Sequence, residues 1–504
     1  MLKRFIQWAE DLRISVWKFL ILVAIFSATR AYIGIITFKY ADISRLAFLN
    51  CISYHLMDFI FILFMLKAIT NERIDKISSI MTLVIPLIIL PPIIDKYIPS
   101  IFFDFVSLYS TTGIHITGGY FENFRISIGQ LIEKTIIILL LGAYIYDKLN
   151  VKKNLKKFIL AVFSPFFIFM SLYIMDALLS WIIYKWAIPS GSFDNFTKEY
   201  PYIISNFLYI LIGFILFWLT ILLENPKKVW VLLKDASPPR VIHFSLMFIL
   251  GFVIQFEKHG PYSNVYLNGN ILMALIGVFS AASGWAFVVA INNYYDKEED
   301  EITNQQRGLA SKKYSEINLL NFAILALSAG AYTSLILGLW PLIFYALFTF
   351  LGFAYSYPRI HLKKYGVKTI IIGLGSSILF GMGYTSPWYP MHSLFDRSFW
   401  TYFVILFAVF STGSAMNDLK DFESDRIHDI KTIFTIFGIE KGKIIGSVML
   451  IVAFSLPSIL APVFTPVFIG LAILGVFLLI KEKVTYIYFV YFTEYLIILF
   501  FHGL

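Results

Sequence analysis

The sequence predicts an all-α polytopic membrane protein, and three observations support this fold class. Of its 504 residues, 59% are hydrophobic and 14% are charged, whereas a soluble domain carries roughly 25% charged residues. The mean hydropathy is +0.76, and the apolar residues gather in runs of about 20, the length that crosses a bilayer as a helix. The basic residues gather in the short polar segments between these runs, as the positive-inside rule expects.

About fifteen helical spans are expected at roughly 20 apolar residues each. Those before residue 224, about six by this length rule, lie near residues 16–38, 52–70, 78–96, 132–147, 158–184 and 203–223. Those after it, about nine by the same rule, lie near 241–257, 269–291, 316–335, 338–356, 369–386, 399–416, 443–458, 463–480 and 485–502. The charged N-terminal segment ahead of them is expected to form a short amphipathic helix on the membrane, not a cleaved signal.

A polar, basic segment at residues 225–240 divides the chain. It contains three prolines, which resist a continuous helix, so we expect a linker with an interfacial helix. The predicted domains on either side are a transmembrane domain of unknown role at residues 1–224 and a second transmembrane domain at residues 241–504. The second domain carries all the polar motifs described below.

The charge pattern predicts the topology. Alternating the loops across the bilayer places roughly thirty Lys and Arg residues on one side and about nine on the other, so the first side is expected to be cytoplasmic, together with the N-terminus. The net charge of +9 follows from this bias. No basic stripe with interleaved aromatic residues lies in a polar context, which argues against a nucleic-acid partner. Cys51 is the only cysteine, which excludes an intramolecular disulfide and a Cys-based zinc site.

The first polar motif begins where an apolar span ends, in the sequence INNYYDKEEDEITNQQRGLAS. Asn292, Asp296 and Asp300 are spaced by four, so a helix would place them on one face. Carboxylates crowded at the edge of the hydrocarbon repel one another, and a bound divalent cation would relieve that repulsion. Oxygen ligands favour a hard ion such as Mg²⁺. The alternative reading is a solvated charged loop that follows a helix.

The second polar motif repeats this arrangement after another span, in the sequence AMNDLKDFESDRIHDIKT. Asp421 and Asp425 are again four residues apart, and Asp418 precedes Asp421 by three. Both motifs fall on the predicted cytoplasmic side. Two acidic clusters can hold two Mg²⁺ ions across a shared cavity, with a diphosphate bridging them, and the repetition argues against two unrelated charged loops.

A basic segment, AYSYPRIHLKKYG, lies between the two motifs at the end of a span. It carries Arg359, His361, Lys363 and Lys364 after Tyr355. Cations at this place would take up the negative charge of a departing diphosphate. The alternative is ordinary positive-inside marking, which we prefer for Lys364.

Together the three stretches resemble the UbiA superfamily of intramembrane prenyltransferases, over about residues 226–504. The first family motif is matched by Asn292, Asp296, Asp300, Asn304 and Arg307, the middle loop by Tyr355, Ser356, Pro358, Leu362 and Lys363, and the second motif by Asn417, Asp418, Asp421, Asp425, Arg426, Ile430, Lys431 and Thr432. The resemblance implies a nine-helix bundle, which agrees with the nine spans expected there. The first 224 residues resemble no family that we recognise.

Six positions depart from the family pattern: Asn293, Gly308, Arg359, His361, Ser424 and Asp429. Asn293 replaces an aspartate and lowers the negative charge of the motif by one. His361 replaces a basic residue, so its charge would depend on pH. Ser424 and Asp429 replace two glycines of the family pattern, and Gly308 stands where the family has proline. Gly308 and Asp429 change the shape of their loops. The choice of acceptor is the inference that these loop changes affect most.

The resemblance also implies a role for each matched residue. The implied metal ligands are Asn292, Asp296, Asp300, Asp418, Asp421 and Asp425, of which Asn292, Asp296, Asp421 and Asp425 are the main ones. The implied diphosphate-binding residues are Arg307, Arg426 and Lys431. The residues expected to act in catalysis are Tyr355, Arg359, His361 and Lys363.

The implied reaction is Mg²⁺-dependent transfer of an isoprenyl or polyprenyl group from an allylic diphosphate to an aromatic or lipid acceptor, within the bilayer and with two ions expected. One alternative is a related transferase that moves a sugar phosphate from phosphoribosyl diphosphate to a polyprenyl phosphate; more basic residues around the site would favour it. A second alternative is a non-catalytic lipid or ion carrier, which Asn293 and His361 permit. The sequence indicates neither the prenyl chain length, the acceptor nor the oligomeric state.

Overall fold

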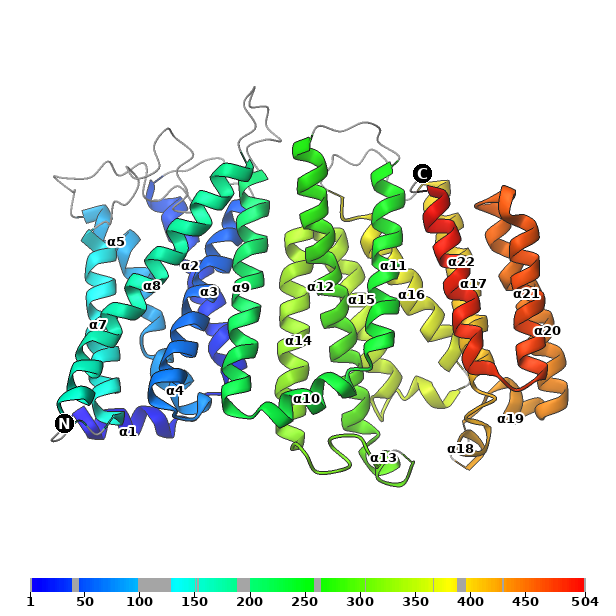
Figure 1. Cartoon of the computed structure of the whole chain (residues 1–504), viewed down its shortest axis with the longest axis horizontal. Helices are drawn as coiled ribbons and strands as arrows, with labels where there is room; N and C mark the ends of the chain where they lie inside the picture. Colours follow the sequence, from blue (N-terminus) through cyan, green and yellow to red (C-terminus); the bar gives the residue numbers. More distant parts are fainter. Residues whose placement is uncertain are drawn as a thin grey trace. The chain divides into compact units, whose positions relative to one another are not determined.

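The structure is a computed structural model that describes residues 2–38, 45–97, 128–149, 151, 154–187, 200–257, 264–303, 305–365, 367–387, 396–427 and 430–502. The regular structure in these residues is entirely helical (Figure 1), which confirms the predicted fold class. Fourteen helices are long and apolar enough to cross a membrane. The chain divides into two compact units, Met1–Trp230 and Val231–Leu504, and each unit is described by itself below.

The N-terminal unit holds six of the fourteen candidate spans. Its elements are α1 (Leu2–Asp11), α2 (Val16–Phe38), α3 (Arg45–Thr70), α4 (Ile74–Thr82), η1 (Ile85–Ile89), α5 (Leu90–Tyr97), α7 (Ile128–Lys148), α8 (Leu155–Ala187) and α9 (Tyr200–Glu224); α10 (Pro226–Asp235) runs into the second unit. The span predicted at 78–96 is therefore not one continuous helix. Prolines at positions 86, 91 and 92 lack the backbone N–H that helical hydrogen bonding needs, which explains the 3-10 turn and the break.

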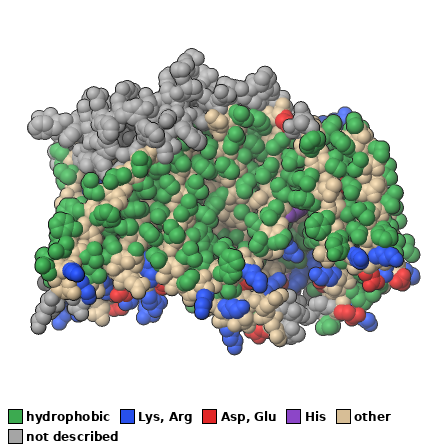
Figure 2. Space-filling view, viewed as in Figure 1, with side chains coloured by type: hydrophobic (Ala, Val, Ile, Leu, Met, Phe, Trp, Pro, Cys, Tyr) green, Lys and Arg blue, Asp and Glu red, His purple; other side chains and the backbone are tan. Residues whose placement is uncertain are grey.

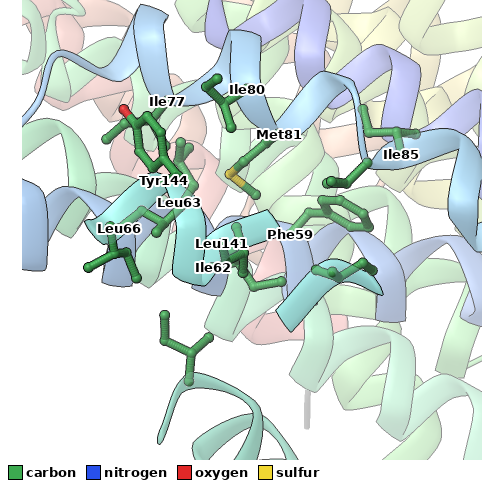
Figure 3. Packing of buried hydrophobic residues seen from close by; sticks show 14 of the residues in the cluster. Phe59, Ile62, Leu63, Leu66, Ile77, Ile80, Met81, Ile85, Leu141 and Tyr144 are labelled. Atoms are coloured by element: carbon green, nitrogen blue, oxygen red, sulfur yellow. The ribbon is translucent and has the colours of Figure 1, made fainter. Parts of the chain in front are cut away.

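The core of the N-terminal unit is formed mainly by α2, α3, α4 and α7, with further buried residues from α1, η1 and α8. Figure 3 shows Phe59 and Leu63 of α3 packed with Met81 of α4 and Leu141 of α7. Leu63, Met81 and Leu141 have no solvent-accessible surface. Lipid tails are as apolar as these side chains, so the hydrophobic effect does not drive helices together inside a membrane. Close van der Waals packing is therefore a main source of helix association there.

A charged pair lies inside the same unit. Arg30 of α2 donates from Nη1 to the Ile88 carbonyl at 3.0 Å and contacts Glu133 Oε2 of α7 at 3.3 Å. The side chains of Arg30 and Glu133 are 12% and 8% exposed. The Ile88 carbonyl belongs to the proline-rich break in the α4–α5 span, so Arg30 satisfies a backbone group that the broken helix releases.

The C-terminal unit holds the other eight candidate spans and one shorter apolar helix, α16. Its elements are α11 (Pro238–Glu257), α12 (Asn264–Tyr295), α13 (Lys297–Thr303), α14 (Glu316–Leu337), α15 (Leu339–Ser356), η2 (Leu362–Tyr365), α16 (Lys368–Tyr384), α17 (Arg397–Asn417), α18 (Phe422–Ile427), α19 (Ile433–Phe437), α20 (Ile439–Ser455), η3 (Leu456–Ile459), η4 (Pro462–Phe464), α21 (Thr465–Ile480), η5 (Val484–Tyr486) and α22 (Ile487–His502). With 17 residues, α16 is about 25 Å long, a little less than the hydrocarbon thickness of about 30 Å.

Helix α16 packs closely against its neighbours because glycines line its contact with α11. A Cβ atom on Gly251 of α11 would lie 2.0 Å from the Phe380 carbonyl oxygen of α16. A Cβ atom on Gly383 of α16 would lie 1.9 Å from the Phe248 carbonyl oxygen of α11. Small residues allow this approach of two backbones inside a membrane bundle. The short helix α16 is thereby fixed in the bundle, and its first residue, Lys368, enters the site described next.

Candidate active site

Both acidic motifs lie at one end of the C-terminal unit, where helices of the bundle give way to short helices. The first motif spans the end of α12 and the whole of α13, and the second spans the end of α17 and the whole of α18. Figure 1 shows α13 and α18 at the same end of the unit. We call this end, which also contains η2 and the start of α16, the motif end. The sequence prediction that the two motifs share one end of the bundle agrees with this arrangement.

The first motif keeps helical geometry across its three predicted ligands. The Asp296 amide donates to the Asn292 carbonyl at 2.9 Å, and the Asp300 amide donates to the Asp296 carbonyl at 2.8 Å. The spacing of four residues therefore places the three side chains on one face. The side-chain oxygen of Asn292 accepts a hydrogen bond from Ser356 Oγ of α15 at 3.1 Å, which fixes its orientation toward the middle segment. Asn293 is only 2% exposed.

Both aspartates of the first motif have a cationic partner. Lys363 Nζ lies 3.1 Å from Asp296 Oδ2, with side chains 14% and 12% exposed. Arg307 Nη1 lies 2.5 Å from Asp300 Oδ2, where the Asp300 side chain is 6% exposed. Both cations were predicted from the sequence to bind diphosphate or assist its departure. In this structure they neutralise the acidic residues beside which a diphosphate would lie.

The second motif has a partner that sequence reasoning missed. Lys368 Nζ, at the start of α16, lies 3.1 Å from Asp418 Oδ1 and 3.5 Å from Asp425 Oδ2. The side chains of Asp418 and Asp425 are 4% and 5% exposed. The Asp425 amide donates to the Asp421 carbonyl at 2.8 Å, and Asp421 itself is exposed. Lys368 stands fifty residues before Asp418 in the sequence, and a lysine at the start of an apolar run gives no signal beyond topology.

Burial shifts the acid strength of the second motif. Desolvation raises the pKa of the Asp418 carboxyl to about 6, although the nearby Lys368 ammonium opposes this shift. Desolvation also raises the pKa of the Asp425 carboxyl, and Lys368 again opposes it. Two carboxyls close together inside a poorly solvated site favour a shared proton or a cation. The second motif is therefore a place where added positive charge is stabilised.

Tyr355, near the end of α15, is close enough to both motifs to interact with their charged groups. It is within electrostatic range of Lys363 and Asp296 on one side and of Lys368 and Asp418 on the other. The carboxyl of Asp425 likewise experiences the charge of Lys363. These couplings indicate that charged groups of the two motifs lie near each other. Figure 2 shows Lys and Arg side chains along the rim of the C-terminal unit at the motif end and a hollow opening there.

The structure gives less detail for the remaining predicted residues. Arg359, Arg426 and Lys431 are exposed. His361 adopts a left-handed backbone conformation, with φ of 43°, which is uncommon for a residue with a side chain. Asn304 and Asp429 lie outside the described residues, as do the side chains of Ser424 and Lys364.

The donor atoms of the site fit Mg²⁺, provided that oxygen atoms from outside the protein complete its coordination. The candidate ligands are carboxylate and amide oxygens, which suit a hard cation. Asp425 Oδ2 is buried, and its ion pair with Lys368 Nζ is long, at 3.5 Å. Across the residues that the structure describes, however, no three His, Cys, Asp or Glu side chains are grouped closely enough to hold an ion by themselves. Mg²⁺ commonly completes its octahedron with water and substrate phosphate oxygens, so the residues fit an ion that arrives with a diphosphate.

An aromatic cluster lies deeper in the bundle, on the helix faces that carry the motifs. Trp285 of α12 precedes Asn292 by seven residues, about two helical turns, so both lie on one face. The Phe244 ring stacks on Trp285 at a centroid distance of 4.6 Å and contacts Phe348 edge-on at 5.3 Å. Phe348 in turn precedes Tyr355 by seven residues on α15. We call Phe244, Trp285 and Phe348 the aromatic layer.

A family model and several known proteins are similar to the C-terminal unit. Residues 244–488 match the model of the UbiA prenyltransferase family, and the N-terminal half matches no family model. The chain is 27% identical over 227 residues to a probable homogentisate phytyltransferase 2 of Oryza sativa subsp. japonica, covering 40% of this chain and 58% of that protein. It is 28% identical over 245 residues to a digeranylgeranylglyceryl phosphate synthase of Saccharolobus solfataricus, covering 48% of this chain and 78% of that protein.

One more relative and two solved structures are also similar to part of the chain. Chlorophyll synthase of Avena sativa is 28% identical over 168 residues, and the match spans 31% of this chain and 43% of that protein. Among solved structures, a digeranylgeranylglyceryl phosphate synthase aligns with a TM-score of 0.43 and 18% identity over 54% of this chain and 97% of that one. A UbiA homologue from Archaeoglobus fulgidus bound to DMAPP and Mg²⁺ aligns with a TM-score of 0.40 and 16% identity, over 53% of this chain and 98% of that one.

Proposed function

Starting from the match of residues 244–488 to the UbiA prenyltransferase family, we propose that this integral, multi-pass membrane protein is a Mg²⁺-dependent prenyltransferase. It transfers an isoprenyl or polyprenyl group from an allylic diphosphate to a hydrophobic acceptor, either aromatic or lipid. The relatives named above are transferases of prenyl groups, which supports the reaction class. The basic bias of the polar segments supports a site that faces the cytoplasm.

The observation that carries the proposal is the arrangement of charge around Tyr355. Two acidic motifs from separate helices meet two lysines, Lys363 and Lys368, within electrostatic range of one hydroxyl. A diphosphate needs cations at both of its phosphoryl groups, and each carboxylate pair needs a cation. Bound Mg²⁺ would be held by Asn292 and Asp296 on one side and by Asp421 and Asp425 on the other, where it supplies positive charge to the leaving diphosphate.

The residues of the chain then have separate tasks. Lys363 and Lys368 exchange their carboxylate partners for diphosphate oxygens, and charge-assisted hydrogen bonds of this kind strengthen as the C–O bond of the substrate breaks. The Tyr355 hydroxyl donates to a diphosphate oxygen between them. The aromatic layer lies deeper in the bundle, where it excludes water from the allylic cation and presents π-faces to it. The acceptor nucleophile bonds to C1 of the prenyl group and releases its proton, and diphosphate leaves.

The test is transfer of radiolabel in membranes that contain the full chain. Label from a prenyl diphosphate is expected in a lipid-soluble product only when Mg²⁺ is present. Label that enters lipid only from phosphoribosyl diphosphate would replace the proposal with transfer of a sugar phosphate. Mass spectrometry of lipids that co-purify with and without Mg²⁺ would then identify the prenyl chain length and the acceptor.

Two variants test whether the protein catalyses prenyl transfer or only binds and carries a lipid or an ion. Asp296→Ala combined with Asp421→Ala is expected to abolish turnover. Asp396→Ala changes an aspartate at the opposite end of α17 and is expected to retain turnover. A carrier would move lipid or ion without any transfer reaction. The proposal would be overturned if the wild type transports lipid or ion without turnover and the Asp296/Asp421 double variant transports it equally well.

A further inference from the structure

The loop that follows the first motif is tied to the end of α10. The carboxyl oxygen Oδ2 of Asp235, the last residue of α10, accepts two hydrogen bonds. The Gly308 amide donates one at 2.8 Å, and the Tyr314 hydroxyl donates the other at 2.6 Å. Tyr314 is 4% exposed, and Gly308 is buried. The sequence alone places Asp235 in a linker, 73 residues from Gly308.

Gly308 is required for this approach. A Cβ atom at position 308 would lie 2.1 Å from Tyr314 Cε1, 2.5 Å from Val231 Cγ1 and 2.8 Å from Asp235 Oδ2. Its amide is the donor to Asp235, and a proline at this position would have no N–H to donate. The departure of Gly308 from the family pattern thus has a physical counterpart in Asp235.

The tied loop carries Arg307, the partner of a predicted metal ligand. The Arg307 carbonyl accepts hydrogen bonds from the Ser311 amide and the Ser311 hydroxyl, both at 2.8 Å. These bonds fold the loop back on itself beside the Asp235 carboxyl. The Arg307 guanidinium then reaches Asp300 Oδ2 at 2.5 Å. A continuous set of contacts therefore runs from Asp235 through the loop backbone to Asp300.

Apolar packing also joins the end of α10, the 305–315 loop and the end of α12. Leu232 of α10 and Leu309 and Tyr314 of the loop belong to one buried cluster with Ala290 and Ile291 at the end of α12. The indole N–H of Trp285 donates to the Ala236 carbonyl at 3.1 Å. These contacts fix the end of α10 against α12, the helix that carries the first motif. The position of Asp235 relative to the first motif is therefore fixed as well.

We propose that Asp235 is a positioning residue for the proposed diphosphate site: it fixes the 305–315 loop so that Arg307 holds Asp300 in place and offers its remaining guanidinium donors to the diphosphate. This inference rests on the proposed function. Residues that orient the ligands of a metal commonly change metal affinity or activity by about tenfold or more when replaced. Asp235 acts through Arg307 and does not itself touch the substrate.

A matched control for Asp235 is Asp396, which lies at the end of α17 opposite the second motif. Asp396 Oδ1 also accepts from one backbone amide, that of Phe399 at 2.8 Å, and from one tyrosine hydroxyl, that of Tyr384 at 3.0 Å. It lies at the start of α17, whereas Asp418 lies at its end, about 30 Å away at helical rise. Loss of either aspartate removes the same kinds of bond, but only Asp235 is connected to the first motif.

The experiment uses the full chain in detergent and compares Asp235→Ala and Tyr314→Phe with Asp396→Ala and Tyr384→Phe. Binding of Mn²⁺ in the presence of inorganic diphosphate is followed by electron paramagnetic resonance, and hydrogen exchange of residues 305–315 is followed by mass spectrometry. Asp235→Ala is expected to weaken Mn²⁺ binding about tenfold and to remove the exchange protection of the loop. Asp396→Ala is expected to change neither quantity beyond about twofold, and Asp235→Asn, which keeps an acceptor oxygen, is expected to recover part of both.

Two outcomes would overturn the inference. If Asp235→Ala leaves loop protection unchanged, Asp235 does not fix the loop. If loop protection is lost but Mn²⁺ binding falls no more than in Asp396→Ala, the bond is structural only. A wild-type protein that binds no Mn²⁺ with diphosphate would instead refute the proposed function, while hydrogen exchange would still report whether Asp235 fixes the loop.

Discussion

Replacing Lys368 with alanine tests the electrostatic account of the second motif. The change leaves Asp418 and Asp425 without the ammonium group that lies 3.1 and 3.5 Å from their oxygens. Both carboxyls are at most 5% exposed, so water cannot replace the lost charge. Removing one partner of a buried pair costs about 3–5 kcal/mol. In a unit of this size each kcal/mol lowers the melting temperature by roughly 2 °C or more, so we expect a decrease of roughly 6 °C or more.

Thermal unfolding in detergent, with and without Mg²⁺, is the assay. Lys443→Ala is the matched control, because Lys443 also pairs with two acids and is also 15% exposed, but its partners Glu440 and Glu482 are 88% and 63% exposed. Exposed pairs contribute about 0–1 kcal/mol, so this control should melt close to the wild type. Mg²⁺ should raise the melting temperature of Lys368→Ala more than that of the wild type. Equal melting temperatures for the two variants, with no extra effect of Mg²⁺, would refute the reasoning.

Three other results are expected. Arg30→Ala should destabilise the N-terminal unit by about 3–5 kcal/mol because Glu133 is left buried without its cation; a double variant with Glu133→Ala should recover part of this in thermal unfolding, and strict additivity of the two changes would contradict it. Gly251→Ala should lower stability by about 1–3 kcal/mol, since its Cβ would overlap the Phe380 carbonyl, and an unchanged melting curve would contradict the close approach of α11 and α16. Chelation by EDTA should stop prenyl transfer in a labelled-substrate assay, and added Mg²⁺ should restore it; undiminished turnover in EDTA would contradict the metal requirement.

The sequence predicts the parts of this protein that depend on local pattern. Runs of apolar residues predict the spans, because a bilayer demands a fixed helix length. The spacing of Asn292, Asp296 and Asp300 predicts one helical face, and their amide hydrogen bonds follow that helix. The predicted span at 78–96 shows the limit of such patterns, since hydropathy does not register the three prolines that break it.

Contacts between distant segments were not predictable in the same way. Lys368 is an ordinary lysine at the start of an apolar run until α16 and α17 pack together and place it beside Asp418. Asp235 lies in a segment whose composition indicates a linker, and only tertiary packing brings Gly308 within hydrogen-bonding distance of it. A single sequence records propensity and periodicity, whereas these partners are chosen by the way whole helices pack.

The hydrogen bonds of Asp235 also decide where the two halves of the chain can be separated. Composition indicates a linker with an interfacial helix at residues 225–240, but the end of α10 belongs to the folded C-terminal unit. Proteolytic cleavage between Glu224 and Pro226 would release a fragment that keeps this carboxyl, whereas cleavage after Ala236 would remove it. A gene fusion or domain exchange that joins new sequence upstream of Pro226 would therefore keep the Asp235 contacts of the proposed diphosphate site, and one that joins it after Ala236 would not.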